Sequence, residues 1–130
     1  DQPDASRGLY RALGIVMKSF NRSAITVLGT AEFLKWVIET HPELHRWELD
    51  SLNQHPSVYM VEMEDQNLWG ECFETHYYEI FRNEVGEYIY DGAKWPENIS
   101  LELFRRWFTF VYHESAVYDL CNKELEVFDE

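Results

Sequence analysis

Acidic and aromatic side chains are interleaved between residues 69 and 91, and they are the residues best suited to binding chemistry in this chain. Carboxylates spaced along an exposed surface can imitate the phosphates of a nucleic acid or meet the basic site of a nuclease. Tyrosine and tryptophan add rigid contact area to such interfaces. We therefore predict a partner-binding surface made of Trp69, Glu71, Glu74, Tyr78, Glu79, Glu84, Glu87, Tyr90 and Asp91.

The same stretch also fits an ordinary β-sheet with an aromatic face in the core and an acidic face in water. Aromatic residues nevertheless occur on both predicted faces. If helices cover one of these faces, then some of Trp69, Tyr78 and Tyr90 stay exposed beside acidic neighbours. An exposed aromatic group of this kind favours an interface.

The five histidines do not indicate a metal site. His41 and His45 have the spacing that can place two imidazoles on one side of a helix, with Glu43 between them. Pro42 stands where an HExxH helix carries its general-base glutamate, and no spacing indicates a third ligand. We therefore predict neither a metal nor a cofactor.

Nucleophilic catalysis has no clear signature in the sequence. His113, Glu114 and Ser115 are adjacent, so they point apart on a helix and cannot form a triad among themselves. Cys72 and His76 would lie ~13 Å apart on a strand, too far for a hydrogen bond. We predict no catalytic residue. A small enzyme stays an alternative, and its acid–base residues in a helix–sheet cleft would be His76, Glu74 and His113.

The cysteines and the apolar pattern predict a cytoplasmic protein. Cys72 and Cys121 are far apart and form no CxxC pair, so we expect two reduced thiols, at least one of them buried. The polar, acidic start of the chain is unlike a signal peptide, and no apolar run reaches the ~18 residues that span a bilayer.

The charge is strongly acidic, with 24 Asp and Glu against 11 Lys and Arg and a net charge of −13. Such a field disfavours direct binding to nucleic acid or to an anionic membrane, and it favours a basic protein partner. The first 22 residues are an exception. They contain four basic residues predicted to share one side of a first helix: Arg7, Arg11, Lys18 and Arg22.

The organising element is predicted to be a helix over residues 100–120, with Ser100 as its N-cap and Glu102 in its first turn. Its apolar residues occupy most of the circumference, which is typical of a central helix. Further helices are predicted over residues 6–20 and 30–41, the second capped by Thr30, with another helical turn over 42–49. Strands are predicted over residues 57–63, 72–82, 87–90 and 124–128, with a hairpin turn over 83–86 and a strand or buried linker over 24–28.

This order of elements predicts an α+β fold in a single domain over residues 7–130, after a disordered segment over residues 1–6. The domain would contain a small antiparallel sheet of about four to five strands packed by about three to four helices.

We expect a non-enzymatic acidic protein that inhibits a basic partner, such as a nuclease-like or DNA-binding protein, by occupying its charged site. In size and composition the chain resembles small immunity, antitoxin and anti-restriction proteins, some of which mimic nucleic acid. The alternatives are the small enzyme and a regulatory subunit that oligomerises, for example as a homodimer. The inhibitor predicts an exposed carboxylate patch, the enzyme a pocket with a buried and perturbed carboxylate or histidine, and the subunit a large apolar contact.

Overall fold

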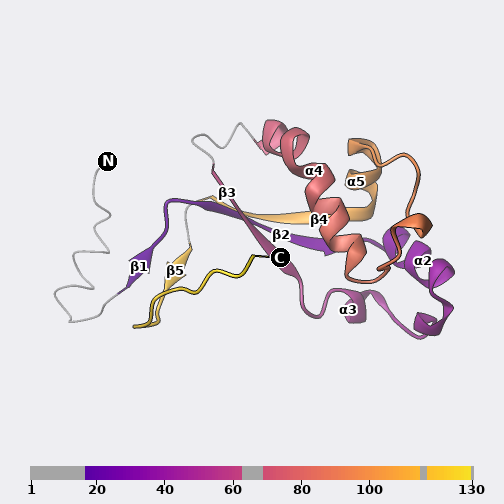
Figure 1. Cartoon of the computed structure of the whole chain (residues 1–130), viewed down its shortest axis with the longest axis horizontal. Helices are drawn as coiled ribbons and strands as arrows, with labels where there is room; N and C mark the ends of the chain where they lie inside the picture. The colour runs from indigo at the N-terminus through magenta and orange to yellow at the C-terminus, as the bar shows by residue number, and fades with distance from the viewer. Residues whose placement is uncertain (1–16, 63–68, 115–116, 130) are drawn as a thin grey trace.

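A three-stranded antiparallel sheet with the strand order β3-β2-β4 organises the fold. The structure is a computed structural model that describes residues 17–62, 69–114 and 117–129. The strands of this sheet are β2 (Ser23–Gly29), β3 (Ser57–Val61) and β4 (Phe108–His113). A two-stranded sheet of β1 (Lys18–Ser19) and β5 (Tyr118–Asp119) lies apart from the helices (Figure 1).

The helices lie toward the end of the larger sheet that is remote from β1 and β5 (Figure 1). They are α2 (Ala31–Thr40), η1 (Pro42–Leu44), α3 (Leu49–Leu52), α4 (Trp69–Gly86), η3 (Gly92–Lys94) and α5 (Leu101–Trp107). The predicted α+β class, with small antiparallel sheets packed by helices, is confirmed. In the described parts of the chain, every helix is too short or too polar to cross a membrane.

β2 is the central strand because its β-branched and apolar residues pack between two partners. Ile25 lies opposite Tyr59 of β3 and Tyr112 of β4, and Val27 lies opposite Phe110. Residues paired in this way share one face of the sheet. The apolar run over residues 24–28 is therefore a strand and not a linker.

Helix α4 crosses that face of the sheet and forms an aromatic core with α5 and β4. The ring centroid of Phe73 lies 4.5 Å from that of Phe110 and 5.8 Å from that of Phe104. Phe81 stacks on Trp107 with a centroid distance of 5.3 Å. Phe81 and Phe104 are both fully buried, so the core lies between the helices and this face of the sheet.

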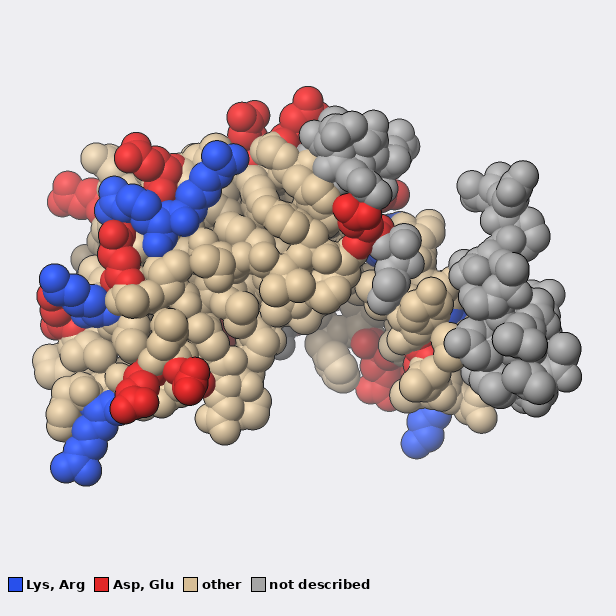
Figure 2. Space-filling view, turned by 180° about the vertical axis from the view of Figure 1, so that it is seen from behind, with Lys and Arg blue, Asp and Glu red and all other residues tan. Residues whose placement is uncertain are grey.

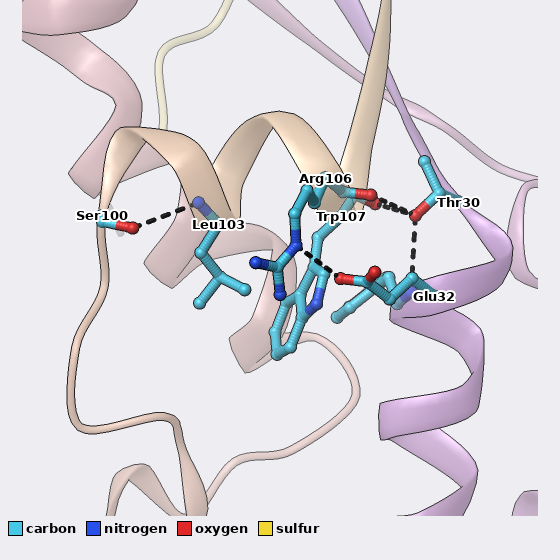
Figure 3. Close-up of polar contacts among 7 residues, drawn as sticks. Thr30, Glu32, Ser100, Leu103, Arg106 and Trp107 are labelled. Atoms are coloured by element: carbon cyan, nitrogen blue, oxygen red, sulfur yellow. Dashed lines mark hydrogen bonds and ion pairs between the residues drawn. The ribbon is translucent and has the colours of Figure 1, made fainter.

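Thr30 joins the start of α2 to the end of α5 (Figure 3). Its hydroxyl donates to the carbonyl oxygens of Arg106 at 2.7 Å and Trp107 at 3.0 Å, and it accepts from the backbone N–H of Phe33 at 3.4 Å. Glu32 forms an ion pair with Arg106 at 3.0 Å beside this joint. The predicted Thr30 cap is confirmed, and it also ties two helices together.

The long central helix predicted over residues 100–120 is wrong beyond Trp107. The Ser100 cap is confirmed, because its hydroxyl accepts from the backbone N–H of Leu103 at 3.1 Å. From Phe108 to His113, however, the chain is strand β4 and pairs with β2 along its whole length. The aromatic and β-branched residues of this segment suit a pleated sheet, and pairing with β2 overrides their helical spacing.

The hairpin predicted over residues 72–90 is also wrong. Residues 69–86 form one helix, α4, and Gly86 is its last residue. Residues 87–90 continue as a turn and coil. The physical reason is that the large apolar residues also recur at helical spacing: Phe73, Tyr77, Ile80, Phe81 and Val85.

Other predictions are only partly upheld. The helix over residues 30–41 and the helical turn begun by Pro42 are found as α2 and η1. Most of the helix predicted over residues 6–20, including Arg7 and Arg11, lies outside the described residues, as does segment 1–6. Lys18 and Ser19 form strand β1 instead. Residues 124–128 are exposed coil, because the described chain offers them no partner strand.

The second face of the larger sheet is largely uncovered. It carries Val58 and Met60 of β3 and Val111 of β4, whose side chains are 59%, 54% and 46% exposed. Strand β3, found within the predicted range of residues 57–63, is therefore covered on one face only. Helices α2 and α4 contact the sheet through its aromatic face.

Candidate functional site

The outer side of α4 carries four of the nine predicted binding residues. Glu71, Glu74, Tyr78 and Glu79 are all exposed on α4. Glu71, Glu74 and Tyr78 follow one another at spacings of three and four residues and so share one side of the helix, and Glu79 adjoins Tyr78 at the edge of that side. The opposite side of α4 is held in the aromatic core. We call these four residues the α4 acidic face.

Tyr78 is fixed by a neighbour on the same side of the helix. The guanidinium of Arg82 lies over its ring, 5.7 Å from the centroid, in a cation–π contact. The α4 acidic face therefore combines three carboxylates with an aromatic ring whose position is restrained by one cation.

The remaining predicted residues do not join this face as one surface. Trp69 is partly buried, with its ring 4.6 Å from that of Tyr112. Glu84 is buried on the inner side of α4. Glu87 and Tyr90 follow the helix and are exposed, and Asp91 caps η3 by accepting from the N–H of Ala93 at 3.0 Å.

Glu84 is the one buried acid of the described chain, at 8% exposure. It accepts a hydrogen bond from the hydroxyl of Tyr59, and Tyr59 in turn accepts from the side-chain N–H of Asn83 at 2.8 Å. Burial raises the pKa of the Glu84 carboxyl, and the nearby Glu87 carboxylate raises it further, while hydrogen bonds from Tyr59 and Ser57 offset part of this rise. Burial also raises the pKa of Tyr59, which keeps its hydroxyl a donor.

A pocket of about 380 Å³ opens beside Glu84. Its walls come from the end of β2, the loop between α3 and β3, and the C-terminal end of α4 with the residues after it. Asn53 shapes this loop, because its side chain accepts from the N–H of Gly29 at 2.8 Å and donates to the carbonyl of Gly29 at 2.9 Å. The acidic and polar lining residues are Ser51, Asn53, His55, Ser57, Glu84 and Glu87.

The sequence predicted Glu84 as a binding residue, but it did not predict that Glu84 is buried, hydrogen-bonded and beside a pocket. The missed residues are Tyr59 and Ser57 of β3, His55 of the loop before β3, and Asn83, the neighbour of Glu84 on α4. A signal for Glu84 was nevertheless present, because it falls at a position where the helical period of α4 calls for an apolar residue. A carboxylate at such a position indicates a buried acid that needs partners.

The acid–base residues of the enzyme alternative lie away from this pocket. Glu74 is exposed on α4, and His76 is partly buried on the same helix. His113 is on β4, where its Nε2 lies 2.9 Å from the hydroxyl oxygen of Thr26. None of the three lines the pocket beside Glu84.

Cys72 and His76 are four residues apart on α4, so they share a side of a helix and the predicted strand separation does not apply. Burial raises the pKa of the Cys72 thiol, which disfavours the nucleophilic thiolate. Cys72 and Cys121 are both free, as predicted. Cys72 is only partly buried and Cys121 is exposed, so neither is the fully buried thiol we expected.

The His41 and His45 side chains have separate partners. His41 lies 3.7 Å from the Glu43 carboxylate, and Nδ1 of His45 lies 3.2 Å from the carbonyl oxygen of Pro42. Within residues 17–62, 69–114 and 117–129, no three His, Cys, Asp or Glu side chains are grouped as a metal site requires.

Charged residues are distributed unevenly over the surface. In the view of Figure 2, Lys and Arg lie among Asp and Glu at the margins of the larger body, and a broad area without charged residues occupies its centre. The net charge of −13 therefore does not make all parts of the surface equivalent for a basic partner.

The buried carboxyl of Glu84 should make the free energy of unfolding depend on pH. Its pKa in the folded state is raised above the ordinary value of 4.5, so the stability that it contributes is present below that value and is lost as the pH rises through the folded pKa. Glu84→Gln keeps an acceptor for Tyr59 and should flatten this part of the profile. Thermal unfolding from about pH 4 to 8 measures the effect. The exposed substitution Glu79→Gln is the control, and an equal flattening there would contradict the assignment.

Comparison of the chain with protein-family models, curated proteins and solved structures finds no significant match.

Proposed function

We propose that the protein is a non-enzymatic acidic binding protein that occupies the basic site of a protein partner through the α4 acidic face. The observation that carries this proposal is the exposure of Glu71, Glu74, Tyr78 and Glu79 along one side of a single helix. Three carboxylates in this arrangement attract a cationic surface, and Tyr78 adds apolar contact.

The rigidity of α4 supports a role in binding. Phe73 and Phe81 hold its inner side in the core, so the outer carboxylates keep their relative positions before a partner arrives. A preorganised surface loses less conformational freedom on binding than a flexible acidic tail does. A nuclease-like or DNA-binding protein has a cationic site of the required kind.

We propose that this binding takes place in the cytoplasm. The support is the free state of Cys72 and Cys121, since exposed thiols such as Cys121 persist in a reducing compartment.

Two variants with equal net charge test the α4 acidic face. The first carries Glu71→Gln, Glu74→Gln and Glu79→Gln, and the matched control carries Glu97→Gln, Glu124→Gln and Glu126→Gln, which are exposed acids outside α4. Both are immobilised, together with the original chain, for capture from a lysate of the encoding organism at low salt.

We expect the original chain and the control to retain the same basic protein, released by about 0.5 M salt because the Debye length then shortens to a few ångströms. The α4 variant should bind it about 3- to 150-fold more weakly, since three exposed charge pairs each contribute about 0.2–1 kcal/mol. Equal losses in the two variants would show that only the net charge matters and would refute the proposed face.

The uncovered sheet face favours a second candidate, self-association as a homodimer. Val58, Met60 and Val111 are 59%, 54% and 46% exposed. Their β2 partners on this face are uncharged, because Thr26 pairs with both Val58 and Val111, and Ala24 pairs with Met60. A second copy with the same net charge of −13 meets least repulsion over an uncharged face.

Sedimentation velocity at several protein concentrations tests this candidate. A dimer that the double substitution Met60→Glu, Val111→Glu converts to monomer would support it. A monomer at all concentrations would eliminate it and would leave the α4 proposal unaffected.

A further inference from the structure

We propose that the pocket beside Glu84 is a binding site for a small organic ammonium ion, a primary amine with an apolar body. This proposal does not depend on the α4 acidic face, because none of its four residues lines the pocket, which contacts α4 through the buried Glu84.

The size of the pocket fits a small molecule. Its volume of about 380 Å³ lies near the lower end of the ~300–1,000 Å³ that is usual for ligand sites. Its lining includes the buried Phe33 and Phe108 of the core, and also Ser51 of α3 and His55 of the following loop, which are exposed. A ligand can therefore place an apolar part against the core while the entrance of the pocket stays open to solvent.

The charge of the lining selects a cation. Glu84 and Glu87 are acidic, and the lining contains no Lys or Arg. In the described chain, Glu84 has no ion-pair partner among the Lys and Arg side chains. A buried carboxylate without a cation is costly, so a bound ammonium group would supply the missing counter-charge.

The Glu84 carboxylate is held ready for such a ligand. The Tyr59 hydroxyl donates to one of its oxygens, and Asn83 fixes Tyr59. A charge-assisted hydrogen bond to an acceptor that is already oriented and largely shielded from water is stronger than one at the surface.

Aromatic side chains in the pocket wall can contact both the ammonium group and the apolar body of the proposed ligand. Trp47 and Tyr88 meet edge to face, with centroids 5.9 Å apart, and Phe33 lies 5.7 Å from Tyr88. All three line the pocket. Aromatic faces attract cations and also pack against apolar groups.

Three probes of one shape test the role of charge: benzylamine, benzyl alcohol and benzoate, titrated into the full chain by calorimetry or NMR near pH 7. We expect benzylamine to bind at least about 10-fold more tightly than benzyl alcohol, and benzoate to bind more weakly than either, as expected for a charge-assisted contact with Glu84. Equal binding of the amine and the alcohol would overturn the proposal, as would no binding of the amine.

Variants then locate the contact. Glu84→Gln should lower the affinity for benzylamine about 10-fold or more and leave that for benzyl alcohol unchanged, whereas Glu79→Gln, on the outer side of the same helix, should change neither. Equal weakening by both substitutions would show a diffuse effect of net charge and would refute the site. If Glu84→Gln does not fold, then Glu87→Gln provides the test, with an expected several-fold loss for the amine alone.

Discussion

Replacing Phe104 with alanine should lower the free energy of unfolding by about 3–5 kcal/mol. Phe104 is fully buried where α4, α5 and β4 meet, and its ring centroid lies 5.1 Å from that of Phe110 and 5.6 Å from that of Phe108. The substitution removes buried apolar area and leaves a cavity among stiff rings that cannot collapse into it.

Urea denaturation measures this loss, and Phe128→Ala is the matched control. Phe128 is 75% exposed, so its removal should change the free energy of unfolding by less than about 0.5 kcal/mol. Similar values for the two substitutions would mean that Phe104 is not at the centre of the core.

Asn53→Ala should lower the free energy of unfolding by roughly 2–4 kcal/mol, the second large effect. The Asn53 side chain satisfies both the N–H and the carbonyl of Gly29, at 2.8 and 2.9 Å. Alanine leaves both backbone groups without this partner, and each partly buried group left unpaired costs about 1–3 kcal/mol.

The same denaturation experiment on Asn98→Ala supplies the comparison, because Asn98 is an exposed residue between η3 and α5. Its change should stay within about 0.5 kcal/mol. An equally small effect at Asn53 would indicate that water replaces both hydrogen bonds and that Asn53 does not hold the pocket wall in place.

Local signals in the sequence predicted part of the fold correctly. Thr30 and Ser100 were identified as N-caps because the hydroxyl and the amide that it binds are only three residues apart. The apolar run over residues 24–28 leaves a strand and a buried linker open as alternatives, and pairing with β3 and β4 makes it the central strand.

Two segments were misassigned because each carries both a helical and a strand pattern. In α4 the alternation of aromatic and polar residues suggested a strand, although Phe73, Tyr77, Ile80 and Phe81 also follow a helical period. The helical pattern extends over the 18 residues of α4, which is longer than an ordinary strand. Segment length therefore favours a helix over a strand here. The opposite error at residues 108–113 arose because the β2 residues that pair with them, from Ala24 to Gly29, lie 79 to 89 residues earlier in the chain, beyond the reach of any local pattern.

The arrangement of the binding residues also depends on structure that local sequence patterns do not specify. The exposure of Glu71, Glu74 and Glu79 follows from their acidic type, but their arrangement along one helix required the correct secondary structure. The setting of Glu84 depends on Tyr59, which reaches it from β3, a contact between residues 25 apart in the sequence. Sequence alone does not specify such a tertiary contact.

The most direct measurement of where a basic partner binds is an NMR titration of the isotopically labelled full chain with a defined Arg- and Lys-rich peptide. We predict that amide shifts concentrate at Glu71, Glu74, Tyr78 and Glu79, and that they disappear in the variant in which the three α4 carboxylates are replaced by glutamine. The control with Glu97, Glu124 and Glu126 replaced should keep them. Shifts spread evenly over the exposed acids of the chain, or unchanged by the α4 substitutions, would contradict the assignment of α4 as the binding surface.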